Sequence, residues 1–123
     1  PLLSDRSKPE LSRKSIRNPG LLAAAGLPVA IMTDHPVIPV QYLPVSAAMA
    51  VRAGMSETQA LEAITITAAR LCGAGDILGS IEAGKLADLA LFSGHPFDFR
   101  SQTRLVLSQG RSLSAAPHSE VSG

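Results

Sequence analysis

The sequence predicts an α/β fold, and three observations carry this prediction. The chain has 123 residues, which suits one domain and leaves no room for two of ordinary size. Hydrophobic residues make up 46% of the chain and charged residues 17%, so there is enough apolar material for a core. A helix-forming stretch is followed at 29–33 by a short apolar run, which is typical of a strand in a parallel sheet.

The first predicted helix begins at Asn18, a good N-cap, and is followed by that strand. Pro19 takes the first helical position, where its missing N–H costs nothing, and Gly26 ends the helix. The run at 29–33 shows no alternation of polar and apolar residues. We therefore expect a strand that is buried on both faces and ends at Asp34.

Three further helices are predicted in the middle of the chain. One starts near Val45 and is stopped by Gly54. The next opens with the capping box at 56–59, Ser-Glu-Thr-Gln. A β-branched Thr-Ile-Thr run then interrupts the helix, and Thr67 is expected to cap a last helix that ends near Leu71.

The remainder of the chain has the pattern of short strands. Strands are expected at 78–81 and 87–92, followed by a hairpin over 104–113. Residues 114–123 are rich in Ser and Ala and are expected to form a disordered tail. The strand at 29–33 needs parallel partners of the same character, and this chain offers none. The sequence therefore describes a piece of a larger fold.

Composition and charge exclude several classes of protein. The formal net charge is +1 and aromatic residues make up 3% of the chain, which argues against a nucleic-acid partner. No apolar run reaches the roughly 18–20 residues that cross a bilayer, so no membrane partner is expected. Cys72 is the single cysteine, which favours a reducing compartment such as the cytoplasm. The basic stretch 1–17 is either a solvated loop or an anion-contacting loop.

Asp34 is the first candidate for a chemical role. It ends a predicted parallel strand, and α/β barrels mount their catalytic groups at that end, although an Asp before Pro-rich sequence is more often a turn residue. His35 either contacts substrate or is an ordinary surface residue. Cys72 is interpreted as a small buried hydrophobe and His95 as a turn residue. No His-x-His, His-Glu-x-x-His or paired-Cys motif supplies the three ligands of a catalytic zinc.

Three segments resemble the C-terminal third of the metal-dependent amidohydrolases. They are Pro-Val-Ala-Ile-Met-Thr-Asp-His-Pro at 28–36, Glu-Ala-Ile-Thr-Ile-Thr-Ala-Ala-Arg-Leu at 62–71, and Gly-Ser-Ile-Glu-Ala-Gly-Lys-Leu-Ala-Asp-Leu at 79–89. The third motif is quite specific for the superfamily. The nearest branch is the imidazolonepropionase-like group, with dipeptidases of the prolidase type, and the resemblance covers about residues 18–113.

The resemblance implies a C-terminal fragment of a (β/α)₈ TIM barrel together with strands of the small amidohydrolase β-sandwich. Residues 1–75 would supply the last barrel strand and its helices, and residues 76–113 the sandwich strands. Asp34 matches the family's Asp that binds metal and shuttles a proton, and His35 would face the substrate. The Asn usual before Ala-Ala-Arg is replaced by Thr67.

The implied function is hydrolysis of a carbon–nitrogen bond, in a non-peptide or a dipeptide, by metal-activated water. The implied cofactor is a divalent metal, expected to be zinc, whose other ligands are not in this chain. A small molecule is the expected substrate. Whether the intact protein is a homo-oligomer is left open. This chain alone is expected to be inactive. The alternative is a catalytically inactive fragment or an interaction module that lacks the metal ligands.

Overall fold

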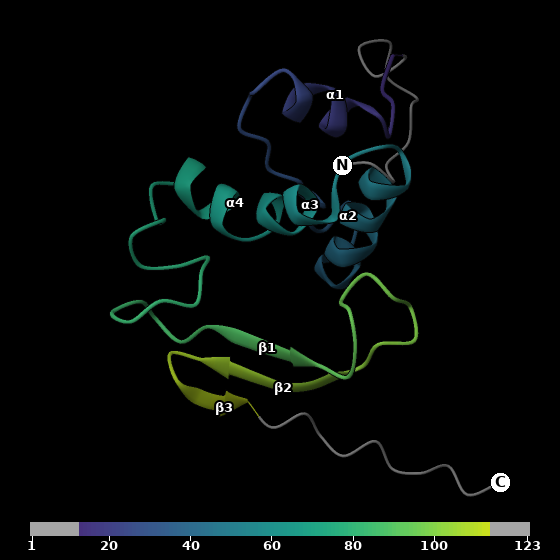
Figure 1. The fold of residues 1–123 in the computed structure, drawn as a ribbon. Helices are drawn as coiled ribbons and strands as arrows, with labels where there is room; N and C mark the ends of the chain where they lie inside the picture. The colour runs from purple at the N-terminus through teal and green to yellow at the C-terminus, as the bar shows by residue number, and fades with distance from the viewer. Residues whose placement is uncertain (1–12, 114–123) are drawn as a thin grey trace, which may run out of the picture. The chain divides into compact units, whose positions relative to one another are not determined.

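The structure, a computed structural model, describes residues 13–113 and is shown in Figure 1. The chain divides into two compact units, Pro1–Lys85 and Leu86–Gly123, which are described one at a time. The described part of the first unit is helical, and that of the second is a three-stranded sheet. None of the described helices is long and apolar enough to cross a membrane.

The first helix, α1 (Asn18–Ala24), ends as predicted and starts one residue early. Its N-cap is Arg17, with no side-chain cap, so the prediction of Asn18 as the N-cap is wrong. Gly26 has a φ of 77°, and its N–H donates to the carbonyl of Ala23. Leu27 donates in turn to the carbonyl of Leu22, which completes a Schellman motif and reverses the chain.

The segment 29–33 is extended but forms no strand, contrary to expectation. Ile31 and Thr33 are buried, whereas Ala30 before them and Met32 between them are exposed, so one face of the segment is covered rather than two. The N–H of Ile31 donates to the carbonyl of Ala63 at 3.0 Å. A strand needs a neighbouring strand to complete its ladder, and the described part of the first unit contains none.

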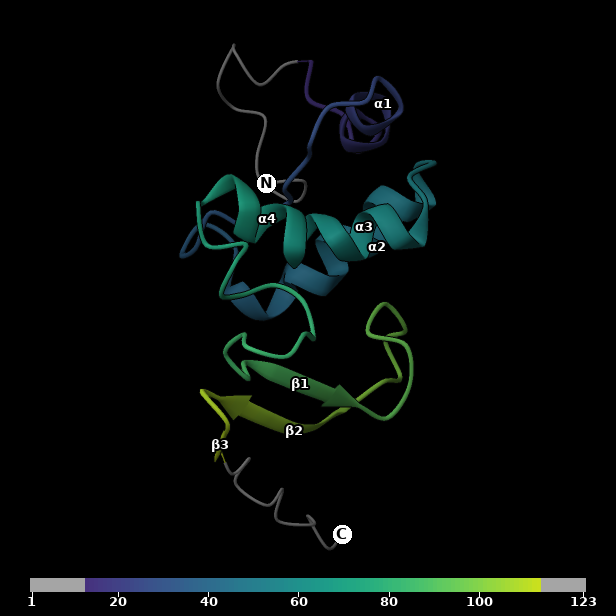
Figure 2. The same cartoon turned by 60° about the vertical axis from the view of Figure 1, so that its left-hand side comes forward.

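Two helices pack closely through alanines and form the centre of the core. A 3₁₀ turn, η2 (Val40–Tyr42), leads into α2 (Leu43–Arg52), which contacts α3 (Glu57–Ala63), and Figures 1 and 2 show these two helices side by side. Alanine lets helix backbones approach closely and leaves little void. The buried apolar residues are Ile31, Ile38, Ala47, Ala50, Met55, Ala60 and Ala63.

The capping box and the helix break are both present, with one change. Ser56 accepts the N–H of Gln59 at 3.2 Å, and its own N–H donates to Gln59 Oε1 at 3.3 Å. The last helix, α4 (Ile66–Leu71), has Thr65 at its N-cap position, so the prediction that Thr67 caps it is wrong. The Thr65 hydroxyl instead donates to the carbonyl of Leu61 at 2.7 Å, which bonds it to the preceding helix.

The segment after α4 is a set of turns, and the strand expected at 78–81 is absent. The ammonium of Lys85, only 11% exposed, holds these turns together. Its Nζ donates to the Gly75 carbonyl and to Ser80 Oγ, both at 2.6 Å, and lies 3.4 Å from Glu82 Oε1. These bonds all lie within residues 75–85, and the first unit extends to Lys85.

The second unit contains an antiparallel sheet in the order β1-β2-β3. Its strands are β1 (Leu89–Phe92), β2 (Thr103–Ser108) and β3 (Arg111–Leu113), which confirms the predicted hairpin. Gln109 and Gly110 turn the chain with φ of 50° and 77°, the left-handed pair that suits a two-residue hairpin. Asp88 accepts the Gln109 N–H at 2.6 Å and braces this turn.

The loop between β1 and β2 is closed by local bonds. Ser93 donates its N–H to the Gln102 carbonyl at 2.9 Å. His95 Nδ1 accepts the N–H of Phe97 at 3.2 Å, which fits its predicted place in a turn. The guanidinium of Arg100 beside Asp98 lowers the pKa of that carboxyl to about 2.

Gly79→Ala should destabilise the first unit more than Gly84→Ala does. Both glycines have a φ near 90°, which costs an alanine about 1–2 kcal/mol. A Cβ on Gly79 would lie 2.8 Å from the Ile66 Cα and the Ala69 Cβ, whereas one on Gly84 meets nothing within 4 Å. Overpacking adds about 1–3 kcal/mol at Gly79. Denaturant unfolding measures both, and equal losses would contradict the packing of 79 against α4.

Asp88→Ala should loosen the turn between β2 and β3, because the Gln109 N–H loses its acceptor. The expected loss of stability in the second unit is about 1 kcal/mol. Asp88→Asn keeps an acceptor oxygen and is the matched control. Amide exchange at Gln109 is the measurement, and equal protection in the two variants would argue against this role for the carboxylate.

Candidate functional site

Asp34 and His35 lie on a turn that follows the extended segment. Both residues are exposed. Asp34 has a φ of 58°, and its carbonyl accepts the N–H of Val37 at 2.8 Å, which closes the turn. The His35–Pro36 peptide is cis. The carboxylate of Asp34 accepts no hydrogen bond from the described residues, so it is free to bind an outside group.

A divalent metal is the cofactor that the family resemblance implies, and the described residues fit it only in part. A carboxylate is a suitable ligand, and that of Asp34 accepts no hydrogen bond from the described residues. A catalytic zinc takes about three protein ligands, however, and residues 13–113 contain no group of three His, Cys, Asp or Glu side chains that could hold an ion. The described part of the chain therefore does not make a metal site by itself.

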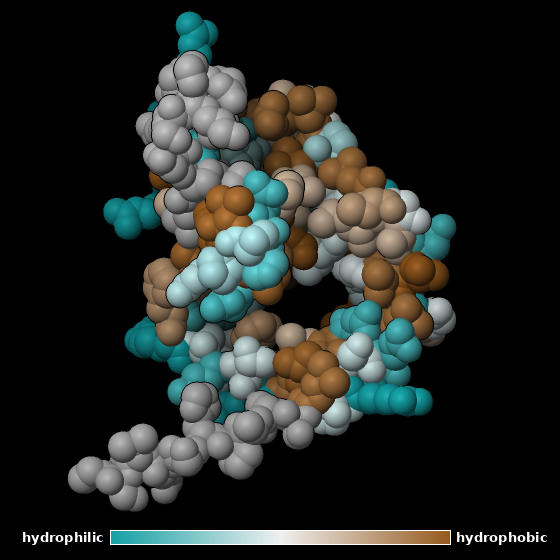
Figure 3. All heavy atoms as spheres, turned by 180° about the vertical axis from the view of Figure 1, so that it is seen from behind, coloured by the Kyte–Doolittle hydropathy of each residue, from teal (hydrophilic) through white to brown (hydrophobic). Residues whose placement is uncertain are grey.

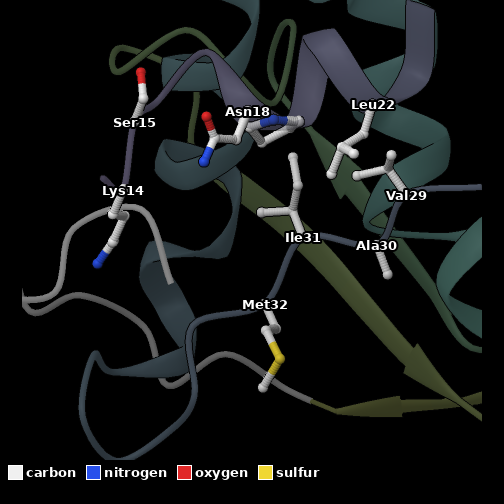
Figure 4. A pocket seen from close by; sticks show the side chains of 9 residues that line it. Lys14, Ser15, Asn18, Leu22, Val29, Ala30, Ile31 and Met32 are labelled. Atoms are coloured by element: carbon white, nitrogen blue, oxygen red, sulfur yellow. The ribbon is translucent and has the colours of Figure 1, made fainter. Parts of the chain in front are cut away.

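An apolar groove of about 220 Å³ lies between α1 and the extended segment, and Figure 4 shows its lining. Leu22 of α1 points toward Val29 and Ile31, whereas Met32 points away from α1. A second groove runs beside it. Asp34 and His35 line neither groove. The residues of the first groove are Lys14, Ser15, Asn18, Pro19, Leu22, Val29, Ala30, Ile31 and Met32.

The backbone of this extended segment is largely unpaired. Ile31 donates to Ala63, but the N–H groups of Val29, Ala30, Met32 and Thr33 have no acceptor among residues 13–113. An extended apolar segment with free N–H and C=O groups is a template for pairing with another strand. The segment therefore leaves most of its backbone donors available for pairing.

Large apolar side chains are exposed on the first unit, and Figure 3 shows such residues gathered on one face of it. Exposed apolar surface of this extent is typical of an interaction site. Cys72 is also exposed, so the expectation that it is buried is wrong; it is the C-cap of α4, which has no fully buried residue. The exposed large apolar residues of this unit are Leu21, Leu22, Leu27, Met32, Val37, Val40, Tyr42, Leu61, Leu71, Ile77 and Ile81.

Two side chains outside the candidate site have clear structural roles, and that of Lys85 was not singled out from the sequence. Lys85 joins the turns after α4, and Asp88 braces the hairpin turn. Both belong to the Gly-Lys-Leu-Ala-Asp-Leu motif at 84–89, so the motif itself was the available signal. The structure gives these two residues hydrogen-bonding roles.

The sequence pattern of the amidohydrolase family matches residues 1–113. The chain belongs to the amidohydrolase family. This confirms the resemblance drawn from the three motifs. The solved structure of an amidohydrolase from Thermotoga maritima superposes with a TM-score of 0.90 at 40% sequence identity, covering 94% of this chain and 30% of that one.

Curated relatives point to one branch of the amidohydrolases. An imidazolonepropionase of Aromatoleum aromaticum is 48% identical over 75 residues, and one of Geobacillus kaustophilus is 41% identical over 75. Each match covers 58% of this chain and 18% of the relative. This amidohydrolase chain thus spans about a fifth of the length of the curated relatives that it matches.

Amide hydrogen exchange tests the unpaired segment of this amidohydrolase chain. The Ile31 amide should exchange more slowly than those of Ala30 and Met32, by about tenfold or more, because it alone of the three is hydrogen-bonded. NMR resolves the three amides in one experiment. Uniform slow exchange across 29–33 would mean that the segment is already paired.

Proposed function

We propose that this chain is the C-terminal portion of a hydrolase that cleaves a carbon–nitrogen bond in a small molecule. The observation that carries the proposal is the family match over residues 1–113 together with 48% identity to an imidazolonepropionase. The enzyme class follows from the family. The substrate is proposed to be a cyclic amide or a dipeptide, and the intact protein to act in the cytoplasm, in keeping with the free thiol of Cys72.

The proposed architecture is a (β/α)₈ barrel with an attached β-sandwich. The first unit would supply the eighth barrel strand, at 29–33, and the helices that follow it. The unpaired backbone and exposed apolar residues of this segment support that role, because a barrel strand has neighbours on both sides. The three strands of the second unit would belong to the sandwich. The likeness to the Thermotoga maritima amidohydrolase supports both assignments.

Asp34 is proposed as the catalytic residue of the chain. Its carboxylate would accept a proton from the attacking water and return it to the leaving nitrogen as the C–N bond breaks. It stands at the end of the extended segment, where barrel enzymes place catalytic groups, and no described residue occupies its oxygens. His35, next along the exposed turn, is proposed to contact the substrate.

A divalent metal, with zinc the proposed ion, would be held by Asp34 together with residues outside this chain. Such an ion polarises a carbonyl and activates water when bound. The absence of a three-ligand group among residues 13–113 means that these residues alone should not retain zinc. Assembly of the intact protein as a homo-oligomer would be compatible with the exposed apolar surface.

A second candidate is an inactive fragment or interaction module. Two observations favour it: residues 13–113 hold no cluster of metal ligands, and Asp34 lies outside the two grooves. On this view the exposed apolar surface serves binding rather than the assembly of an enzyme. The two candidates differ in what happens when the chain is extended.

Expression of the chain with the residues that its gene encodes before Pro1 separates the two candidates. The extended protein should bind zinc and hydrolyse imidazolone propionate or a dipeptide, whereas the 123-residue chain should do neither. Metal analysis and a hydrolysis assay on both proteins measure this. An extended protein that binds no zinc and hydrolyses neither probe would favour the interaction module.

Asp34→Asn in the extended protein should lower kcat by about 10²–10⁴-fold, because the proton carrier is lost. Asp76→Asn is the matched control, since Asp76 is also an exposed carboxylate and makes no hydrogen bond within the described residues. It should leave kcat within about twofold. Full activity in Asp34→Asn would rule out the role proposed for this carboxylate.

A further inference from the structure

The turn that carries Asp34 and His35 has an anchored form. Residues 34–37 are all exposed, but the residues on either side, Thr33 and Ile38, are 5% and 7% exposed. A buried residue thus anchors each end of this four-residue exposed turn. A turn tethered so tightly at both ends has few conformations open to it.

Two features of the backbone restrict the turn further. The Val37 N–H donates to the Asp34 carbonyl at 2.8 Å, which links its first and last residues. Asp34 itself takes a φ of 58°, a conformation that an L-residue keeps when its surroundings determine it. The turn uses the main-chain carbonyl of Asp34 and leaves the side-chain carboxylate free of described donors.

The extended segment that leads into the turn is held in place as well. Ile31 is buried, and its N–H is bonded to the Ala63 carbonyl at the end of α3. The extended segment is therefore held to the helical core two residues before the first anchor, Thr33. On the outgoing side, Ile38 belongs to the same buried apolar set as the alanines of α2 and α3.

We infer that residues 34–37 form a preorganised turn that holds the Asp34 and His35 side chains in position. Thr33 and Ile38 are the positioning residues of this turn. This inference rests on the proposed function for its catalytic meaning. Ile38 touches no reacting atom in this scheme. It acts by fixing the turn, so that the carboxylate enters the reaction without a further ordering cost. An error of about 1 Å in such a group costs up to about 10²-fold in rate.

The structural part is tested on the 123-residue chain. Ile38→Ala should speed amide exchange at Val37 by about tenfold, because the outgoing anchor is lost. Met55→Ala is the matched control: Met55 is equally buried, and it lies against Gly20 of α1 rather than beside the turn. It should change Val37 exchange by no more than its effect on global unfolding. Equal acceleration in the two variants would overturn the inference.

Ile38→Val is the conservative variant, and it also serves if Ile38→Ala does not fold. It keeps most of the buried side chain and should retain Val37 protection close to that of the unmodified chain. The coupling constant that reports the φ of Asp34 should stay unchanged in Ile38→Val and average toward other conformers in Ile38→Ala. An unchanged coupling in Ile38→Ala would show that Ile38 does not hold the turn.

The catalytic part is tested in the extended protein, with imidazolone propionate and a dipeptide as probes. Ile38→Ala should lower kcat about ten- to a hundredfold with little change in KM, and Ile38→Val should restore it. Met55→Ala should change activity only in proportion to the folded fraction. A kcat in Ile38→Ala equal to that of Met55→Ala overturns the positioning role. Full activity in Asp34→Asn would instead overturn the proposed function and leave the exchange result standing.

Discussion

The hydrogen bond from the Ile31 N–H to the Ala63 carbonyl joins the extended segment to the helical core, and much of the first unit depends on it. It lies at the C-terminal end of α3, where helix carbonyls lack an intrahelical donor. One unsatisfied acceptor of the helix thus meets one unsatisfied donor of the segment. The side chain of Ile31 enters the same core as the alanines of α2 and α3. Asp34 is placed three residues beyond this bond.

Local signals in the sequence predicted much of the fold, because their determinants lie within a few residues. The capping box at Ser56, the end of α1 at Gly26 and the hairpin turn at Gln109 each depend on a side chain or a φ angle close in sequence. The errors at Asn18 and Thr67 are shifts of one or two residues at helix starts. Nonlocal features were harder. A strand at 29–33 would require a partner that residues 13–113 do not contain, so the apolar pattern of the segment was visible in the sequence while the absence of a partner strand was not.

The candidate site also combines features that are local in the sequence with features that are not. Asp34 could be singled out as a candidate site residue from its place after an apolar segment and from the Thr-Asp-His-Pro motif. Its backbone conformation and the bond from Val37 could not be predicted, since they depend on which turn the chain adopts, and the burial of Ile38 could not, since it depends on how that turn packs against the core. Lys85 is a similar case. Its identity within a motif was plain, but its bonds to Gly75 and Ser80 arise from the path of the folded segment.

The sheet of the second unit pairs only strands that are neighbours in the chain, β1 with β2 and β2 with β3. Contacts between near neighbours need only short loops to close, so the entropy lost before the first pairs form is small. Assembly of this hairpin array can proceed on its own timescale, independently of any distant segment. The pairing proposed for residues 29–33 is of the opposite kind, because it would need a segment outside the described residues. Within the second unit, therefore, every strand pair closes a loop between neighbours in the chain.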